Sequence, residues 1–415
     1  MGTHNKAVAS IAREVAGFFT RGQPFRIFHG STNSTRPRHN ASQPVIDISA
    51  LSNVLHVDQK AQTALVEPNV PMDKLVEATL AHRLIPPVVM EFPGITAGGG
   101  VAGTSGESSS FRHGFFNSIV EEVEMVLGNG EVVTAKRNNE HADLFRGAAG
   151  AMGSLGLTTL LKIKLMPAKT YVALAYHRTT SVAEAVARIR AETEGDQNDY
   201  VDGILYSKDH GAIITGKLTD DKPAETPVQT FSHACAVTDY IPLAEYLFRY
   251  DRGGFWVGAG AFDYFKFVPL NSLTRWFLDD LLHTRMLYRA LHASSSSVPY
   301  MVQDIAFPYD TAEQFIDYAA AELGTWPLWL CPLKRSAMPT FHPVTADPDD
   351  APAAAAAEDT GASAGAALYA HTYYPERQFW DIYDQPPART GTSDREGHDD
   401  TGGERRTWYH ALREK

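Results

Sequence analysis

A glycine- and serine-rich stretch runs from Pro93 to Gly114, and it limits the architectures open to this chain more than any other segment. It contains Gly98-Gly99-Gly100 followed by Gly103, and then Glu107-Ser108-Ser109-Ser110. The stretch is too long for an ordinary connection and too poor in apolar residues for a core element, and such loops in compact domains are usually functional. Glycine is required where the backbone must approach a flat or anionic ligand without an intervening Cβ. The stretch therefore predicts close contact between the backbone and a bound cofactor.

The residues from Gly98 to Gly103 also match G-x-G-x-x-G, the phosphate-binding pattern of dinucleotide-binding folds. That pattern requires a strand immediately before it and a helix after it. Here Pro93 and Gly94 precede the glycines, and TSGESSS follows them. We therefore interpret the stretch as a cofactor loop of another fold, and a tight glycine loop without a ligand is the alternative.

Strand and helix patterns alternate around this stretch. The runs FRIFHG, VIDIS, VLHVD and TALVEP precede it and the alternating LTTLLKIKLMP follows it, as expected of strands. Apolar Val8, Ile11, Val15 and Phe18 at helical spacing predict a first helix, and Pro71 before MDKLVEATLAHR predicts a second. Asn129-Gly130 predicts a hairpin. We place a first domain at residues 1–168.

From about Tyr171 the pattern changes to longer strands such as GILYS and AIITGKL, with many aromatic residues. An aromatic core explains these residues, but pockets for ring-shaped or chain-like substrates have similar linings, so a substrate (cap) domain at residues 169–340 is expected. Residues 341–367 are interpreted as a low-complexity linker, and residues 368–415 as a C-terminal remnant with a disordered insertion at 385–404. Small and charged side chains bury too little surface there to offset the entropy lost on ordering.

Composition argues against several classes of function. The formal net charge is -12 at pH 7 and no dense Lys/Arg run is present, so we expect no nucleic-acid binding. Cys235 and Cys331 are too far apart in the chain and too few for a disulfide framework or a zinc site, so we expect no metal. No stretch reaches the ~18 apolar residues of a membrane span. We expect a cytoplasmic protein without a transmembrane segment, whose amphipathic first helix could bring it to the surface of an internal membrane.

A second small-residue loop follows the early strand RIF, and its backbone N–H groups and hydroxyls could bind a pyrophosphate. Two such loops resemble the segments that hold FAD in the vanillyl-alcohol-oxidase family. The motif GTSGESSSFRHGFF, and the later segments VDGILYSKDHGAIITGKLTDD, YIPLAEYLFRYDRGGFW and WPLWLCPLK, resemble the delta-24-sterol reductases. The resemblance implies an α+β fold, with a two-lobed PCMH-type FAD-binding domain and an α/β cap domain for the substrate.

The same resemblance implies which residues bind FAD. They lie in the first loop, in the glycine stretch and at one later glycine: His29, Gly30, Ser31, Thr32, Asn33, Ser34, Thr96, Gly98, Gly99, Gly100, Gly103, Ser108, Ser109, Ser110, His113 and Gly156. Thr32 stands where family members that tether FAD from the first loop carry a histidine. We therefore expect FAD to be bound noncovalently.

The resemblance also implies reduction of a carbon–carbon double bond in a lipophilic sterol or isoprenoid-like substrate, with NADPH as the reductant. An isolated alkene accepts hydride poorly, so a positioned acid must protonate its other carbon. Glu107, His113 and Tyr206 are the polar candidates for catalysis, and Lys208 is a further one. Two alternatives stay open. One is an FAD-linked oxidase or dehydrogenase of a small or secondary metabolite. The other is a flavin-binding protein without turnover, because the alanine-rich segment replaces a strand and helix of the family.

Overall fold

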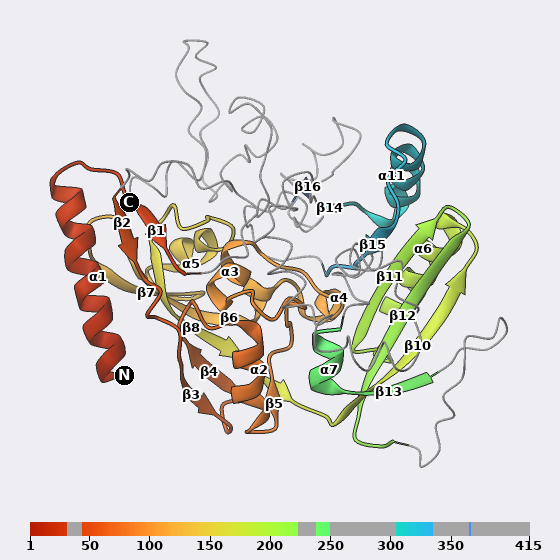
Figure 1. Ribbon diagram of the computed structural model, residues 1–415, viewed down its shortest axis with the longest axis horizontal. Coiled ribbons are helices and arrows are strands. Elements are labelled where there is room, and N and C mark those ends of the chain that lie inside the picture. The colour runs from red at the N-terminus through yellow and green to blue at the C-terminus, as the bar shows by residue number, and fades with distance from the viewer. Residues whose placement is uncertain (31–43, 223–237, 250–303, 335–364, 367–415) are drawn as a thin grey trace, which may run out of the picture.

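The computed structural model describes residues 1–30, 44–222, 238–249, 304–334 and 365–366. These residues form two lobes, each built on a five-stranded antiparallel sheet, which lie side by side in Figure 1. The chain passes from the first lobe to the second at residues 168–170, because β9 (Met166–Pro167) pairs with β5 (Leu84–Ile85) and β10 (Tyr171–Thr179) begins the second sheet. Helices and antiparallel sheets in one chain confirm the α+β class.

The first lobe begins with helix α1 (Gly2–Thr20), which packs against β2 (Val45–Asp47) and β6 (Val120–Val126). Strand β2 pairs in parallel with β1 (Arg26–Phe28). The predicted apolar face of α1 is buried in a cluster with Ile46, Leu51 and Val126. The helix prediction is therefore confirmed. A membrane contact through this face would require the helix to leave the protein.

The first sheet has the strand order β3 (Val54–Asp58), β4 (Thr63–Val66), β8 (Leu157–Lys164), β6 and β7 (Val132–Lys136). Strand β8 alternates buried and partly exposed residues, as its sequence predicts. Strands β6 and β7 form the predicted hairpin, in which Gly130 has φ +87°. A Cβ at Gly130 would lie 2.7 Å from the carbonyl oxygen of Ala12, so this turn requires glycine both for its φ and for the approach of α1.

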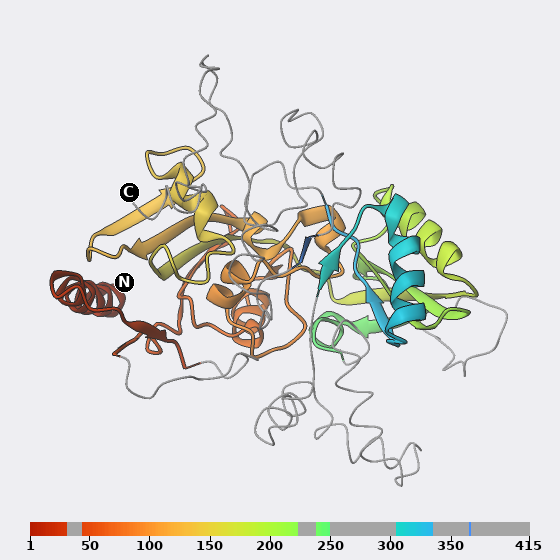
Figure 2. The ribbon, with the colours of Figure 1, turned by 90° about the horizontal axis from the view of Figure 1, so that it is seen from above.

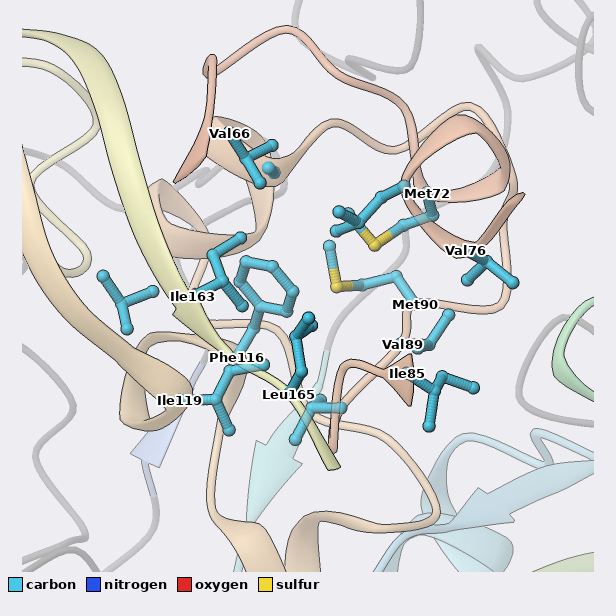
Figure 3. Packing of buried hydrophobic residues seen from close by; sticks show 14 of the residues in the cluster. Val66, Met72, Val76, Ile85, Val89, Met90, Phe116, Ile119, Ile163 and Leu165 are labelled. Carbon is cyan, nitrogen blue, oxygen red and sulfur yellow. The ribbon is translucent and has the colours of Figure 1, made fainter. Parts of the chain in front are cut away.

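Helix α2 (Met72–Leu80) covers the core of this lobe, and α5 (Ala142–Ala148) packs against β7. Figure 3 shows Phe116 and Met90 between the strand that carries Ile163 and the helix that carries Met72. The same cluster continues into the second lobe, since it also contains Val172, Leu174, Ile204 and Ile214. The two lobes therefore share one apolar core.

The glycine-rich stretch differs from the irregular loop that its composition predicts. It contains two short helices, α3 (Ala97–Ala102) and α4 (Ser110–His113), and is followed by the 3-10 helix η1 (Phe116–Ile119). Much of it is buried, including Gly100, Val101 and residues 107–110. The missing side chains let these helices pack closely on the core, and for this reason a run with few apolar residues is still an interior element.

The second sheet has the order β13 (Thr238–Pro242), β10, β12 (His210–Thr219), β11 (Tyr200–Ser207) and β15 (Leu328–Leu330). Helices α6 (Val182–Thr193) and α11 (Tyr309–Glu322) pack together on one face, as Figure 2 shows. Helix α7 (Leu243–Leu247) follows β13, and its buried residues join the core shared with the first lobe. A short pair, β14 (Ile305–Ala306) and β16 (Gly365–Ala366), completes the described elements.

The predicted linker at 341–367 and the C-terminal segment at 368–415 lie outside the described residues, apart from β16. Within the part of the chain that the structure describes, no helix combines the length and apolar character needed to cross a bilayer.

Candidate functional site

The segment of residues 103–113, which ends in α4 and is called here the α4 segment, joins the two lobes (Figure 1). The backbone N–H of Val201 on β11 donates to the carbonyl of Ser108 at 2.8 Å, and that of Lys334 donates to the carbonyl of Ser110 at 3.0 Å. The N–H of Phe116 donates to the carbonyl of Ser105 at 2.9 Å and holds the segment to the first lobe. The predicted cofactor residues of this segment therefore lie at the seam between the lobes.

Helix α3 contains the glycine triplet, and Thr96 caps it by accepting a hydrogen bond from the N–H of Gly99 at 3.1 Å. A Cβ at Gly98 would lie 2.8 Å from Cβ of Pro68, and one at Gly100 would lie 2.5 Å from Cε of Met90. The protein's own packing therefore accounts for glycine at both positions. Gly99 is exposed, and a Cβ there would meet only Oγ1 of Thr96 within 3.5 Å, at 3.1 Å. Of the three glycines, Gly99 is the one with a surface left for a ligand.

The remaining predicted cofactor glycines and the first loop are placed as follows. Gly103 ends α3, and its N–H donates to the carbonyl of Gly99 at 2.8 Å. A Cβ at Gly156 would lie 2.9 Å from the carbonyl oxygen of Val126, so close contact within the first lobe requires glycine there. His29 and Gly30 are exposed after β1, and Gly30 has φ +74°. Ser31, Thr32, Asn33 and Ser34 lie outside the described residues.

Ser108, Ser109 and Ser110 of the α4 segment are buried, with at most 2% of each exposed. The hydroxyl of Ser110 accepts a hydrogen bond from the N–H of Glu107 at 2.8 Å. The hydroxyl of Ser108 lies 3.3 Å from the hydroxyl of Tyr246 on α7. These serines thus order the segment and connect it to the second lobe, a role that their spacing in the sequence does not reveal.

The catalytic candidates are only partly brought together. Glu107 and His113 both lie in the α4 segment. Tyr206 lies five residues beyond Val201 on β11, about 16 Å along the strand, and it is 47% exposed with its ring 5.2 Å from that of His210. Lys208 forms an exposed ion pair with Asp317 on α11 at 3.0 Å. The two groups of candidates therefore lie at opposite ends of β11.

Burial lowers the pKa of His113, and the adjacent Arg112 cation lowers it further, although Asp199 acts in the opposite direction. Its imidazole is therefore neutral at pH 7. Arg112 itself lies 3.6 Å from carboxylate oxygens of both Asp196 and Asp199, which links α4 to the segment before β11 by charge.

The structure adds Asp202 to the acid candidates. It is 2% exposed and lies on β11 one residue after Val201, the strand residue that bonds to Ser108. Burial raises the pKa of the Cys331 thiol well above its usual range, and the carboxylates of Glu107 and Asp202 raise it further. The two carboxyl groups, one from each lobe, therefore both influence this thiol electrostatically. A signal was present in the sequence, because Asp202 is the single charge in the buried run YVDGIL.

Among the buried polar atoms without a hydrogen-bond partner in the described residues, two bear on ligand binding. One is the amide oxygen of Asn117 on η1, and the other is the indole N–H of Trp329 on β15, which packs against the shared core. An acceptor on the first lobe and a donor on the second suit a heterocyclic ligand that offers both kinds of group. Thr104, a buried β-branched residue, has φ +48°, and such strained backbone is concentrated at functional sites. The residues present fit FAD.

Comparison with known proteins identifies an FAD-binding domain in the first lobe. A family model described as an FAD-binding domain matches residues 4–136, from α1 to β7. The chain is 27% identical over 331 residues to a Delta(24)-sterol reductase of Pisum sativum, covering 71% of this chain and 57% of that protein. It is 29% identical over 323 residues to the Delta(24)-sterol reductase of Homo sapiens, covering 71% and 60%. It thus spans about three fifths of the length of these relatives.

A shorter similarity is to cytokinin dehydrogenase 4 of Oryza sativa subsp. japonica, with 30% identity over 158 residues. It covers 37% of this chain and 29% of that protein. The matches to sterol reductases are longer than the whole first lobe and therefore include residues of the second. The match to the dehydrogenase is about the length of one lobe.

Proposed function

Because the chain belongs to the FAD-linked family of the delta(24)-sterol reductases and carries a PCMH-type FAD-binding domain, we propose that it reduces a carbon–carbon double bond of a sterol or isoprenoid-like substrate. NADPH is the proposed reductant. The observation that carries this choice is the length of the similarity. The match to a sterol reductase covers 331 residues, whereas the FAD-binding family model matches only residues 4–136. A flavin-binding domain alone does not select a substrate. The similarity to sterol reductases extends beyond it into the second lobe, which is the lobe proposed to select the substrate.

FAD supplies hydride transfer when it is bound, and the protein must supply geometry, a dry site and a proton. The α4 segment is suited to fix the relative position of the lobes, because both contribute hydrogen bonds to it. The face of the second sheet that joins the shared core presents Tyr200, Ile204 and Trp329. Such a face favours an apolar substrate, since a sugar or hydroxy acid would leave buried hydroxyl groups unpaired at ~1 to 3 kcal/mol each.

We assign the proton donor to the pair Glu107 and Asp202. Both are at least 95% buried, so a proton transferred from either carboxyl group would move where little water competes. Protonation of one alkene carbon requires such a group, and it must lie where water does not compete. His113 is less suited to donate a proton, because its imidazole is neutral at pH 7 and the acidic imidazolium form is not the one present. Tyr206 is too exposed to offer a dry site.

The test is anaerobic mixing of the purified, FAD-loaded protein with NADPH, followed by a sterol that carries a side-chain alkene. The flavin absorbance should bleach with NADPH and return on addition of the sterol, with a product two mass units heavier. Asp202→Asn and Glu107→Gln should keep the bleaching step, and the variant that removes the donor should lose the recovery step. Bleaching by an alcohol or amine substrate, but not by NADPH, would replace this proposal with the oxidase or dehydrogenase. A flavin that responds to none of these substrates would instead favour a flavin-binding protein without turnover.

A further inference from the structure

Asn117 is a buried amide in the middle of the candidate site. It is the second residue of η1 and is 8% exposed, and its Oδ1 has no hydrogen-bond partner in the described part of the chain. Its neighbours Phe116 and Ile119 are core residues at 0% and 3% exposure. Native proteins rarely leave a buried carbonyl oxygen without a donor, because such an oxygen has given up its hydrogen bonds to water.

The position of η1 shows where a partner would come from. The 3-10 helix packs against both α3, which holds the glycine triplet, and α4, which begins at Ser110. It is tied to the α4 segment by the bond from the N–H of Phe116 to the carbonyl of Ser105. Gly114 has φ +78° and turns the chain between α4 and η1. Asn117 therefore lies among the residues expected to bind FAD, inside the region that the FAD-binding family model matches.

We propose that Asn117 is a further FAD-contacting residue, whose amide oxygen accepts a hydrogen bond from an N–H or O–H group of the bound flavin nucleotide. The inference rests on the proposed function, because it requires that FAD binds. The chemistry is complementary: the flavin ring carries an N–H and the ribityl chain carries hydroxyls, whereas the buried amide offers an acceptor without a donor. Occupancy by FAD would remove the cost of the unpaired oxygen.

The test compares Asn117 with a buried amide that has a partner. Asn69 is 9% exposed, and its Nδ2 donates to the carbonyl of Ile48 at 2.6 Å. Leucine has the branched shape of asparagine and the same number of side-chain heavy atoms, so Asn117→Leu and Asn69→Leu make the same change at both sites. The unfolding midpoint of the full-length, flavin-free protein and its dissociation constant for FAD, followed by flavin fluorescence, are measured for each.

Asn117→Leu should leave the midpoint of the flavin-free protein unchanged or raised, because it removes an unpaired polar atom, and should weaken FAD binding about tenfold, the effect of one lost hydrogen bond. Asn69→Leu should lower the midpoint and leave FAD affinity unchanged. Asn117→Asp keeps an acceptor in place and should bind FAD more tightly than Asn117→Leu. If the leucine variant folds poorly, Asn117→Ala replaces it, and the same comparison of FAD affinity with Asn117→Asp tests the inference.

A lower midpoint of Asn117→Leu with unchanged FAD affinity would overturn the inference and assign the amide to an internal or water-mediated bond. A wild-type protein that binds no FAD would instead overturn the proposed function itself. The two failures are therefore distinguishable.

Discussion

Alanine substitutions along Gly98-Gly99-Gly100 separate the packing role of these glycines from contact with a ligand. At Gly98 the new Cβ would lie 2.8 Å from Cβ of Pro68 and 3.0 Å from its carbonyl oxygen. The helix cannot easily move away, because the N–H of Gly98 donates to that same oxygen at 2.8 Å. At Gly100 the new Cβ would lie 2.8 Å from the ring of Phe116, which is fully buried.

The magnitudes follow from two opposing effects. Overpacking costs ~1 to 3 kcal/mol, and alanine regains up to ~1 kcal/mol of helix propensity over glycine. Gly98→Ala and Gly100→Ala should therefore destabilise the protein by ~1 to 2 kcal/mol, or a few degrees in unfolding temperature. At Gly99 the nearest atom is Oγ1 of Thr96 at 3.1 Å, a side-chain atom that can shift slightly. Gly99→Ala should be neutral, or stabilising by up to ~1 kcal/mol.

Flavin content gives the second measurement. If FAD lies against the exposed Gly99, Gly99→Ala should purify with reduced FAD although its flavin-free form melts at or above the wild-type temperature. Scanning calorimetry of flavin-free protein and absorbance of the purified protein provide both values. Two results would refute the reasoning: a Gly99→Ala variant as unstable as Gly98→Ala, or a Gly100→Ala variant that melts at the wild-type temperature.

Four further predictions concern other parts of the molecule. Acid or heat denaturation should release intact FAD into the supernatant, because Thr32 cannot tether it; flavin retained in the precipitate would contradict this. Tyr246→Phe keeps the ring 4.7 Å from that of Tyr200 but removes the hydroxyl near Ser108. Stability should therefore fall by ~0.5 to 1.5 kcal/mol, and amide hydrogen exchange at residues 108–110 should accelerate. Unchanged exchange there would show that this contact does not hold the two lobes together. His4 is buried on α1 and bonds to Glu67 at 2.8 Å and Glu124 at 3.1 Å. His4→Leu should therefore cost ~1 to 3 kcal/mol in urea unfolding, and an equal stability would mean that apolar packing alone docks the helix. Because the folded state lowers the pKa of His113 from 6.5, the unfolded state binds more protons near that pH. Stability should therefore fall as pH drops through 6.5, and His113→Gln should lessen this slope. An identical pH profile of thermal unfolding in the variant would argue against a half-buried neutral imidazole.

Local pattern was enough to predict several elements of the fold. The 3.6-residue spacing of Val8, Ile11 and Val15 predicts α1, the alternation in residues 157–164 predicts β8, and Asn129-Gly130 predicts the hairpin. Each of these signals depends on neighbours in the chain, and one side of each element faces the core. The cofactor class could be predicted for a similar reason, because the motif that indicates FAD is contiguous in sequence.

The rest depended on contacts between residues that are distant in the chain. Nothing in the glycine triplet distinguishes Gly98 and Gly100, which pack against Pro68 and Met90, from the exposed Gly99. The serines next to α4 match a cofactor motif, yet their partners are Val201, Tyr246 and Lys334, which come much later in the chain. Asp202 and the unpaired amide of Asn117 gain their significance from burial, which is a property of the assembled lobes. A sequence pattern specifies which groups are present and which way an element faces, whereas only tertiary packing decides which polar groups lose water and which of them find a partner.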